Sequence, residues 1–447
     1  MPLKPPDVSG WFADCFRRLD KLQTIQLRGK VHQVIGLVIE SIGPQVSMGD
    51  RCVITSRRNG DIQAEVVGFR GNRVLLMPLG EMEGVGPGSV VTASDEPFTV
   101  GVGQGLLGRV INGLGQPIDG KGDLEGIETR RPIINSPPDP LRRSRISRYM
   151  ATGIRSIDSL LTCGKGQRFG IFSGSGIGKS ILMGMVARHT AADVNVIALI
   201  GERGREVREF LEKDLGEAGL RRSVVVTVTS EQPALIRIKG ALAATTIAEY
   251  FRDQGLDVML MMDSVTRFAM ALREVGLAVG EPPTSRGYTP SLFATLPRLL
   301  ERAGTSVRGS ITGLYTVLVE GDDMAEPVAD AVRSILDGHI VLSRKLAAQG
   351  QYPAVDVLDS VSRVMVDVVS EDHRRAAQIF KRLLATYTEA EDLINIGAYE
   401  EGSNPEIDRV IQMIGPMREF LRQNLEEGAD FDDSKARLLE IVAEDEG

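Results

Sequence analysis

The chain has 447 residues, long enough for about two or three domains and a sizeable core. Its net charge of −8, from 60 acidic and 52 basic residues, argues against a nucleic-acid-binding surface over the chain as a whole. No apolar run reaches the ~18 residues that a membrane span needs, and the N-terminus lacks a signal sequence. The three cysteines and four histidines stand far apart, which argues against a metal cluster and fits a reducing compartment. A multidomain cytoplasmic protein is expected.

Residues 1–25 form the first predicted unit, a short amphipathic segment. Trp11, Phe12, Phe16 and Leu19 fall on one helical stripe, and Trp11 is the only tryptophan of the chain. This stripe either packs against its own protein or docks a partner, and the sequence favours neither reading over the other.

Residues 26–97 are predicted to form a β-barrel. Short apolar runs follow one another at close spacing, with turn signals such as Gly71-Asn72 between them. This spacing favours a small barrel. The runs are Val31–Ile39, Cys52–Thr55, Ile62–Phe69, Val74–Met77 and Val90–Thr92.

Residues 98–370 are predicted to form an α/β domain, entered through a connector at residues 98–146 that is rich in glycine and proline. Apolar strands alternate with helical segments, which indicates a parallel sheet covered by helices. Residues 371–447 show helical periodicity and are predicted to form a C-terminal helical domain. The predicted strands of the α/β domain are Arg168–Phe172, Val194–Ile200, Val224–Val228, Val258–Met262 and Leu314–Val319.

A phosphate-binding loop follows the first of these strands. It reads Ser173-Gly174-Ser175-Gly176-Ile177-Gly178-Lys179-Ser180. The glycines let backbone N–H groups turn toward a phosphate, Lys179 supplies charge for the β- and γ-phosphates, and Ser180 would hold magnesium. Ser173 stands where the pattern G-x-x-x-x-G-K-S/T has glycine. This departure matters little, because the first position of the pattern is only the point at which the chain leaves the strand. The alternative is a turn without a ligand, and Lys-Ser at the start of a helix disfavours it. ATP or GTP is the expected ligand.

Charged side chains are predicted at the same edge of the sheet as this loop. Asp263 ends the strand Val258–Met262, which in a P-loop protein places it near the magnesium ion. Glu202 and Arg203 follow the strand Val194–Ile200, at the edge where open α/β sheets bind ligands. Glu202 could orient or activate the attacking water, and Arg203 could hold the γ-phosphate. A solvated charge cluster at a helix start is the alternative for this pair.

Several long motifs, in order, resemble the ATPase of the flagellar and type III protein export apparatus. They are GQRFGIFSGSGIGKS, GERGREV, DSVTRFAMA, GEPPTSRGY, VEGDDMAEPVADAVRSILDGHIVLSRKLA and YPAVDVLDSVSR. More distantly, the chain resembles the catalytic subunits of rotary F- and V-type ATPases. The likeness runs from about Gly29 to about Phe420 and implies a P-loop NTPase core of α/β class with a RecA-like parallel sheet, an N-terminal β-barrel and a C-terminal helical domain.

The resemblance implies roles for the residues around the phosphates. Lys179 and Ser180 match the phosphate and magnesium positions, and Asp263 matches the magnesium-side aspartate. Glu202 matches the catalytic carboxylate and Arg203 the γ-phosphate arginine.

Four further residues are implied by the same resemblance. Arg267 matches another active-site arginine, and Tyr352 matches the aromatic residue that stacks on adenine. Tyr399 would cover the other side of the base, although ordinary packing is the alternative for both rings. Arg363 matches the arginine finger that one subunit gives to the nucleotide of its neighbour.

The presence of both Glu202 and Arg363 in one chain predicts a homohexamer with its sites between subunits, because identical copies could then build complete sites. The family implies hydrolysis of MgATP at the base of a secretion machine, in the cytoplasm and peripherally at the inner membrane. It also implies as partners a stator-like regulator, export-gate membrane components, export chaperones and secreted substrates, and no nucleic acid.

Three alternatives remain at this point. A catalytic subunit of a proton-translocating rotary ATP synthase would need a different partner chain in its ring. A hexameric RNA translocase would need aromatic stacking platforms, and the barrel region offers only Phe69 and Phe98. A nucleotide-binding module without turnover is disfavoured by Glu202.

Overall fold

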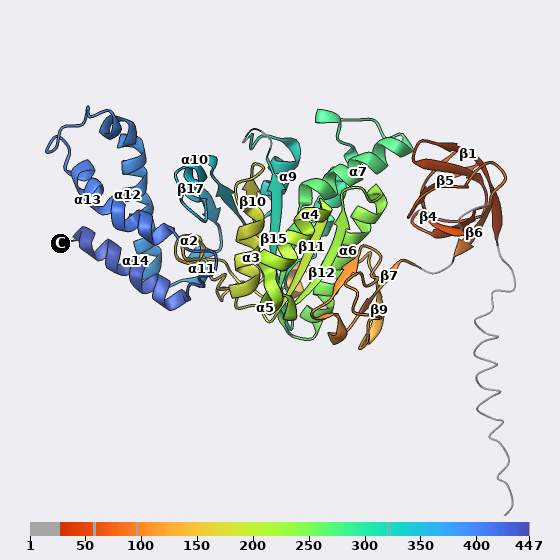
Figure 1. Cartoon of the computed structure of the whole chain (residues 1–447), viewed down its shortest axis with the longest axis horizontal. Coiled ribbons are helices and arrows are strands. Elements are labelled where there is room, and N and C mark those ends of the chain that lie inside the picture. Colours follow the sequence, from red (N-terminus) through yellow and green to blue (C-terminus); the bar gives the residue numbers. More distant parts are fainter. Residues whose placement is uncertain (1–26, 57–59, 95–96, 320, 322, 447) are drawn as a thin grey trace, which may run out of the picture. The chain divides into compact units, whose positions relative to one another are not determined.

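The computed structural model describes residues 27–56, 60–94, 97–319, 321 and 323–446 (Figure 1). The chain divides into two compact units, with the boundary between Pro97 and Phe98. The predicted amphipathic segment 1–25 lies outside the described residues, so its role stays a prediction. Among the described residues, none of the helices has the length and apolar character that crossing a bilayer requires.

The first unit is a closed barrel with the strand order β1-β2-β5-β4-β3-β6. Side chains alternate along each strand, and those that point inward, such as Ile39, Ile54 and Leu76, form a small core of their own. The predicted run Val31–Ile39 is in fact a hairpin, because Gly36 adopts a φ of 56° and reverses the chain. The strands are β1 (Arg28–Ile35), β2 (Val38–Ile42), β3 (Arg51–Thr55), β4 (Asp61–Arg70), β5 (Arg73–Pro78) and β6 (Val90–Ser94).

The second unit is built on a nine-stranded sheet in the order β17-β16-β10-β15-β13-β11-β12-β8, with β14 paired to β15. Neighbouring strands are parallel except at β17 and β14. The predicted parallel α/β core is thereby confirmed. The strands are β8 (Val110–Asn112), β10 (Arg168–Ser173), β11 (Val194–Glu202), β12 (Ser223–Thr229), β13 (Asp257–Asp263), β14 (Gly304–Thr305), β15 (Ser310–Leu318), β16 (Gly338–Leu342) and β17 (Val355–Ser362); β7 (Thr99–Val102) and β9 (Thr129–Pro132) pair separately.

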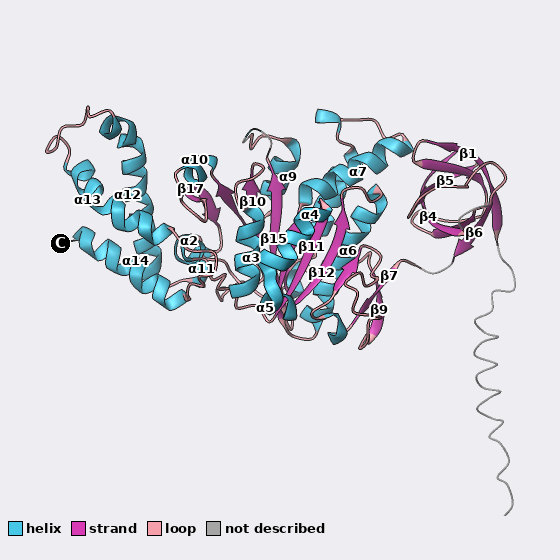
Figure 2. Cartoon of the chain, viewed as in Figure 1, coloured by secondary structure: helices cyan, strands magenta, loops and turns pink. Residues whose placement is uncertain are grey.

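Helices flank this sheet, as Figure 2 shows. Helix α6 contacts β11, β12 and β13, and its buried face is rich in alanine, which allows close approach to the strands. A π-helical turn at Phe210–Leu215 joins α4 to α5. The helices are α2 (Arg155–Leu160), α3 (Lys179–His189), α4 (Gly204–Glu209), α5 (Gly216–Arg221), α6 (Ala234–Asp253), α7 (Val265–Val279), α8 (Pro290–Leu300), α9 (Pro327–Ile335), α10 (Arg344–Ala348) and α11 (Met365–Val368).

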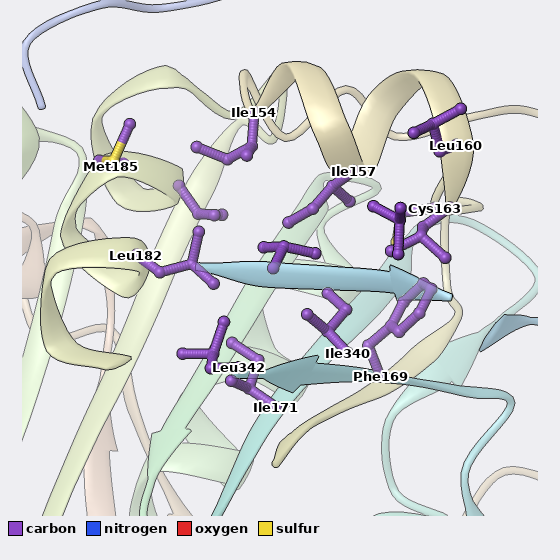
Figure 3. Packing of buried hydrophobic residues seen from close by; sticks show 14 of the residues in the cluster. Ile154, Ile157, Leu160, Cys163, Phe169, Ile171, Leu182, Met185, Ile340 and Leu342 are labelled. Carbon is purple, nitrogen blue, oxygen red and sulfur yellow. The ribbon is translucent and has the colours of Figure 1, made fainter. Parts of the chain in front are cut away.

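Three helices form the predicted helical C-terminal part, α12 (Glu371–Asn395), α13 (Pro405–Leu421) and α14 (Phe431–Glu446). They pack on one another, and α12, α13 and α14 all contact α2. Their apolar faces join the core of the sheet in one continuous cluster. Figure 3 shows part of that cluster, where Ile157, Leu182 and Ile340 from α2, α3 and β16 point toward one another.

Six strands of the second unit were not predicted individually from the sequence, namely β7, β8, β9, β14, β16 and β17. Strand β8 lies in the segment expected to be only a connector, and it adds to the edge of the sheet beside β12. With three residues in a glycine-rich stretch, it is too short to show periodicity. Strands β16 and β17 extend the opposite edge, and β17 runs antiparallel to the rest.

Lys381 on α12 offers a test of how the C-terminal helices pack. The residue is half-buried and has no ion-pair partner among the described residues. Burial lowers the pKa of its ammonium group to about 8. Because the folded pKa lies below that of the unfolded chain, the charged lysine opposes folding below pH ~8, and this penalty disappears as the pH rises toward ~10.

We therefore expect Lys381→Met to raise the midpoint of thermal unfolding near pH 7, and to raise it less near pH 10. Thermal unfolding of both proteins at the two pH values measures this difference. An equal gain at both pH values would mean that the methionine acts through apolar packing alone.

Candidate active site

A cavity of about 710 Å³ opens at the carboxyl ends of the central strands. The loop after β10 forms one wall, and the residues after β11 form another. This is the edge where open parallel sheets bind ligands. The lining residues include Gly174, Ser175, Gly176, Gly178, Lys179, Ser180, Glu202, Arg203, Glu206, Lys213, Arg267 and Leu318.

The loop between β10 and α3 has the backbone of an anion-binding turn. Gly176 and Gly178 adopt φ values of 78° and 96°, which side chains other than glycine rarely tolerate. A Cβ at Gly176 would meet no atom within 4 Å, so the space above it is open. Gly178 is the N-cap of α3, and the positive end of that helix faces the loop. These features suit a bound phosphate.

Lys179 lies between two carboxylates inside this cavity. Its Nζ donates to Oδ1 of Asp263 at 2.5 Å and lies 3.7 Å from Oε1 of Glu202. Asp263 is almost fully buried and also accepts a hydrogen bond from the hydroxyl of Thr316 at 2.8 Å. The ends of α3, β11 and β13 thus bring together three residues that lie far apart in the sequence.

Glu202 has the properties of a group that can exchange a proton near neutral pH. Burial, and next the charge of Asp263, raise the pKa of Glu202 to about 7, against the opposing charge of Lys179. Its Oε1 is buried and has no hydrogen-bond partner among the residues that the structure describes. A buried carboxylate oxygen with this pKa is suited to accept a proton from water.

Two arginines lie at the same cavity in different environments. Arg203 is exposed and pairs with Glu206 at 3.3 Å, so its guanidinium can turn toward a ligand. Arg267, on α7, is half-buried, and its Nε has no hydrogen-bond partner in the described part of the chain. Arg267 packs directly against the backbone of Gly201, where a Cβ would lie only 2.8 Å from the Cβ of Arg267.

The residues present fit a nucleotide triphosphate with magnesium. The space above Gly176 is open to a ligand. Two buried polar atoms at the cavity, Nε of Arg267 and Oε1 of Glu202, have no hydrogen-bond partner among the described residues and could contact a ligand or its water. Ser180 and Asp263 supply the hydroxyl and carboxylate oxygens that magnesium prefers. The ion would neutralise charge on the phosphates when bound.

Tyr352 lies beside the phosphate loop, where a base would sit. It is 44 % exposed and lines a small apolar cavity with Gly178, Ile181 and Leu425. Its carbonyl accepts a hydrogen bond from the backbone N–H of Gln423 at 2.9 Å. Leu425 was missed from the sequence, because only the return of the chain after α13 brings this residue to the cavity.

The structure does not bring Tyr399 to the cavity beside Tyr352. This residue follows α12, and its hydroxyl bonds the carbonyl of Asn404 and the carboxylate of Asp408 at the far end of the α12–α13 hairpin. Seventeen residues of α13 separate that end from the segment beside Tyr352, a distance of about 25 Å. Tyr399 lines neither cavity. A contact of Tyr399 with the base stays a prediction that its position in this chain does not support.

Arg363 lies at the amino ends of the parallel strands β10 and β16, whereas the phosphate loop lies at their carboxyl ends. It directly follows β17, and its backbone N–H donates to the carbonyl of Asp337, the residue before β16. Strand β16 runs parallel to β10, so Arg363 lies beside the beginning of β10. The side chain is exposed and has no ion-pair partner within the described part of the chain.

The fold and this site define a P-loop ATPase with an N-terminal barrel. Family models match most of the chain: the ATP synthase alpha/beta family, beta-barrel domain, matches residues 31–95, and the nucleotide-binding domain of the same family matches residues 153–362. The T3SS EscN ATPase C-terminal domain matches residues 369–440. The chain belongs to the ATP synthase alpha/beta family, and within it to the ATPases of flagellar and type III secretion systems.

Relatives with these names cover the chain closely. A flagellum-specific ATP synthase of Bacillus subtilis (strain 168) is 56 % identical over 438 residues, which is 97 % of this chain and 98 % of the relative. A type 3 secretion system ATPase of Sinorhizobium fredii is 49 % identical over 99 % of this chain and 97 % of its own length. The assembled ATPase EscN of enteropathogenic E. coli superposes with a TM-score of 0.88 at 45 % identity, covering 93 % of this chain and all of EscN.

The position of Tyr352 predicts that its ring supports the base. Replacing Tyr352 with alanine should weaken ATP binding by about three- to tenfold, because a stacked ring contributes on the order of 1 kcal/mol. Tyr352→Phe should bind as the natural chain does. Titration with a fluorescent ATP analogue measures both, and Tyr399→Ala is the matched control that should leave affinity unchanged. Equal losses from Tyr352→Ala and Tyr399→Ala would contradict this assignment.

Proposed function

We propose that this chain hydrolyses MgATP in a ring of identical subunits and thereby energises protein export through a flagellar or type III secretion apparatus. The observation that supports the shared sites is the placement of Glu202 and Arg363 at opposite ends of the parallel strands of one sheet. The relatives named above support the export system.

The residues of the cavity would divide the reaction among them. The backbone of residues 174–178 and the ammonium of Lys179 hold the phosphates, and Ser180 and Asp263 hold magnesium. Glu202 orients the attacking water and accepts its proton as the γ-phosphate leaves. Arg203 and Arg267 bind phosphate oxygens at the rim of the cavity.

Arg363 cannot reach the nucleotide of its own chain. Strand β10 has six residues, so the beginning and end of the strand lie about 20 Å apart. The phosphate loop follows one end and Arg363 lies beside the other. An arginine in this position serves a neighbouring subunit, where its charge stabilises the transferring phosphoryl group.

This geometry supports a closed ring of identical copies, because each copy offers a pocket at one end of the strands and a finger at the other, and we propose that the ring is a homohexamer. EscN has been solved as an assembled ATPase and in complex with its central stalk EscO. In the structure of that complex, the ATPase is 45 % identical to this chain and superposes with a TM-score of 0.86. For this chain we propose the same kind of assembly. A stator-like regulator, export-gate components, chaperones and secreted substrates are its proposed partners, at the cytoplasmic side of the inner membrane.

The two ring alternatives receive less support. A rotary ATP synthase subunit would need a second kind of chain in its ring, and this chain already carries both halves of a site. An RNA translocase would need several aromatic platforms on the barrel, where Phe69 is the exposed aromatic ring among the described residues 27–94.

Removing the carboxylate and removing the finger should have the same kinetic signature. Glu202→Gln should lower kcat by about 10²-fold or more, since it removes the base. Arg363→Ala should lower kcat by about 10³-fold. Both variants should bind ATP nearly as the natural chain does, because neither residue carries the ground-state contacts of the phosphates.

Steady-state hydrolysis and ATP titration measure the two quantities separately, and size-exclusion chromatography shows whether the ring still forms. Loss of ATP binding by Arg363→Ala in an intact ring would exclude a finger role. Full activity of Glu202→Gln would assign proton transfer to another group.

A further inference from the structure

The finger residue Arg363 combines a free side chain with a fixed backbone. Its guanidinium is exposed, whereas its backbone N–H and the preceding residue, Ser362, lie in a network of hydrogen bonds. A side chain that must contact a phosphate on another subunit needs such a fixed backbone, because misplacement by about 1 Å can cost about 10²-fold in rate.

The side-chain amide of Gln167 is the centre of this network. Gln167 is fully buried, and its Nε2 donates to the carbonyl of Asp337 at 3.1 Å and to the hydroxyl of Ser362 at 3.2 Å. Its Oε1 accepts from the backbone N–H of Gly164 at 2.8 Å. Every polar atom of the amide is therefore engaged, and two of the three contacts lead to the segments that hold Arg363.

Both segments are fixed a second time. The carbonyl of Asp337 also accepts from the backbone N–H of Arg363 at 3.0 Å, and the hydroxyl of Ser362 donates to the carbonyl of Thr162 at 2.9 Å. The carboxylate of Asp337 accepts from the backbone N–H, Nε and Nη2 of Arg168 at 3.0–3.1 Å. A bidentate pair of this kind fixes orientation as well as distance.

The close approach of strands β16 and β17 adds to this rigidity. A Cβ at Gly338 would lie 2.6 Å from the carbonyl oxygen of Val361 and 3.2 Å from Nε2 of Gln167. Only glycine fits there, and the strands meet directly beside Ser362.

We propose that Gln167 is a positioning residue for the Arg363 finger, and that it therefore acts on the nucleotide of the neighbouring subunit. This inference rests on the proposed role of Arg363. It has a direct rival, because Gln167 also precedes β10, which leads to the phosphate loop of its own chain. The same substitution could thus act on either of two sites, and the experiment must separate them.

The variant Gln167→Met keeps the length of the side chain and removes the amide. We expect kcat to fall about tenfold or more while KM for ATP changes by less than about twofold, since the finger contributes in the transition state. Ser362→Ala removes one acceptor of the same amide and should reduce kcat in the same direction. If Gln167→Met does not fold, Ser362→Ala takes its place in the test.

Mixed rings decide which site is affected. Glu202→Gln subunits have an inactive pocket and an intact finger, so they can serve the pockets of Gln167→Met subunits. At equal mixing, about a quarter of all pockets combine an intact Glu202 with a correctly held finger, and activity should rise to about a quarter of that of the natural ring. The control is Arg363→Ala mixed with Glu202→Gln, which should recover to the same level.

The outcomes separate the two proposals. Recovery in the control but none with Gln167→Met would overturn the positioning role and locate the damage in the pocket of the same chain. No recovery in the control would overturn the shared site itself. Natural activity of Gln167→Met or Ser362→Ala alone would show that the amide is dispensable for the finger.

Discussion

The two ends of strand β10 impose the constraint on which the active site depends. Its carboxyl end passes into the phosphate loop, and its amino end pairs with the segments that hold Arg363. Because the strand is straight and buried, one chain cannot bring these ends together. In an assembly of identical copies, the phosphate loop of one copy can meet Arg363 of its neighbour. A closed ring is the symmetric arrangement in which every copy has a complete site.

Charge balance organises the side chains that line the pocket. Lys179 is buried deeply enough to need a counter-ion, and Asp263 supplies it at 2.5 Å. Glu202 lies farther from Lys179, at 3.7 Å, and burial, followed by the charge of Asp263, keeps the pKa of its carboxylate high. The same three side chains thus form one ion cluster at the position where we propose that phosphate and magnesium bind.

Much of this arrangement could be predicted from the sequence because it depends on neighbours along the chain. The phosphate loop lies between a strand and a helix, and Asp263 and Glu202 each directly follow apolar strands, so the parallel sheet fixes their common edge. Leu425 and Gln167 could not be found in this way, since each reaches its site through contacts more than 70 residues away. The distance of Tyr399 from the cavity could not be predicted for the same reason, because the length of the α12–α13 hairpin sets its position.

The most direct measurement is the specific activity of MgATP hydrolysis by this chain alone, across a range of protein concentrations, with Arg363→Ala beside it. The account predicts activity that rises with concentration as rings form, reaches a plateau, and is lost in the variant at every concentration. Specific activity that does not depend on concentration in a monomeric sample, or that survives in Arg363→Ala, would show that one chain completes its own site and would contradict the account.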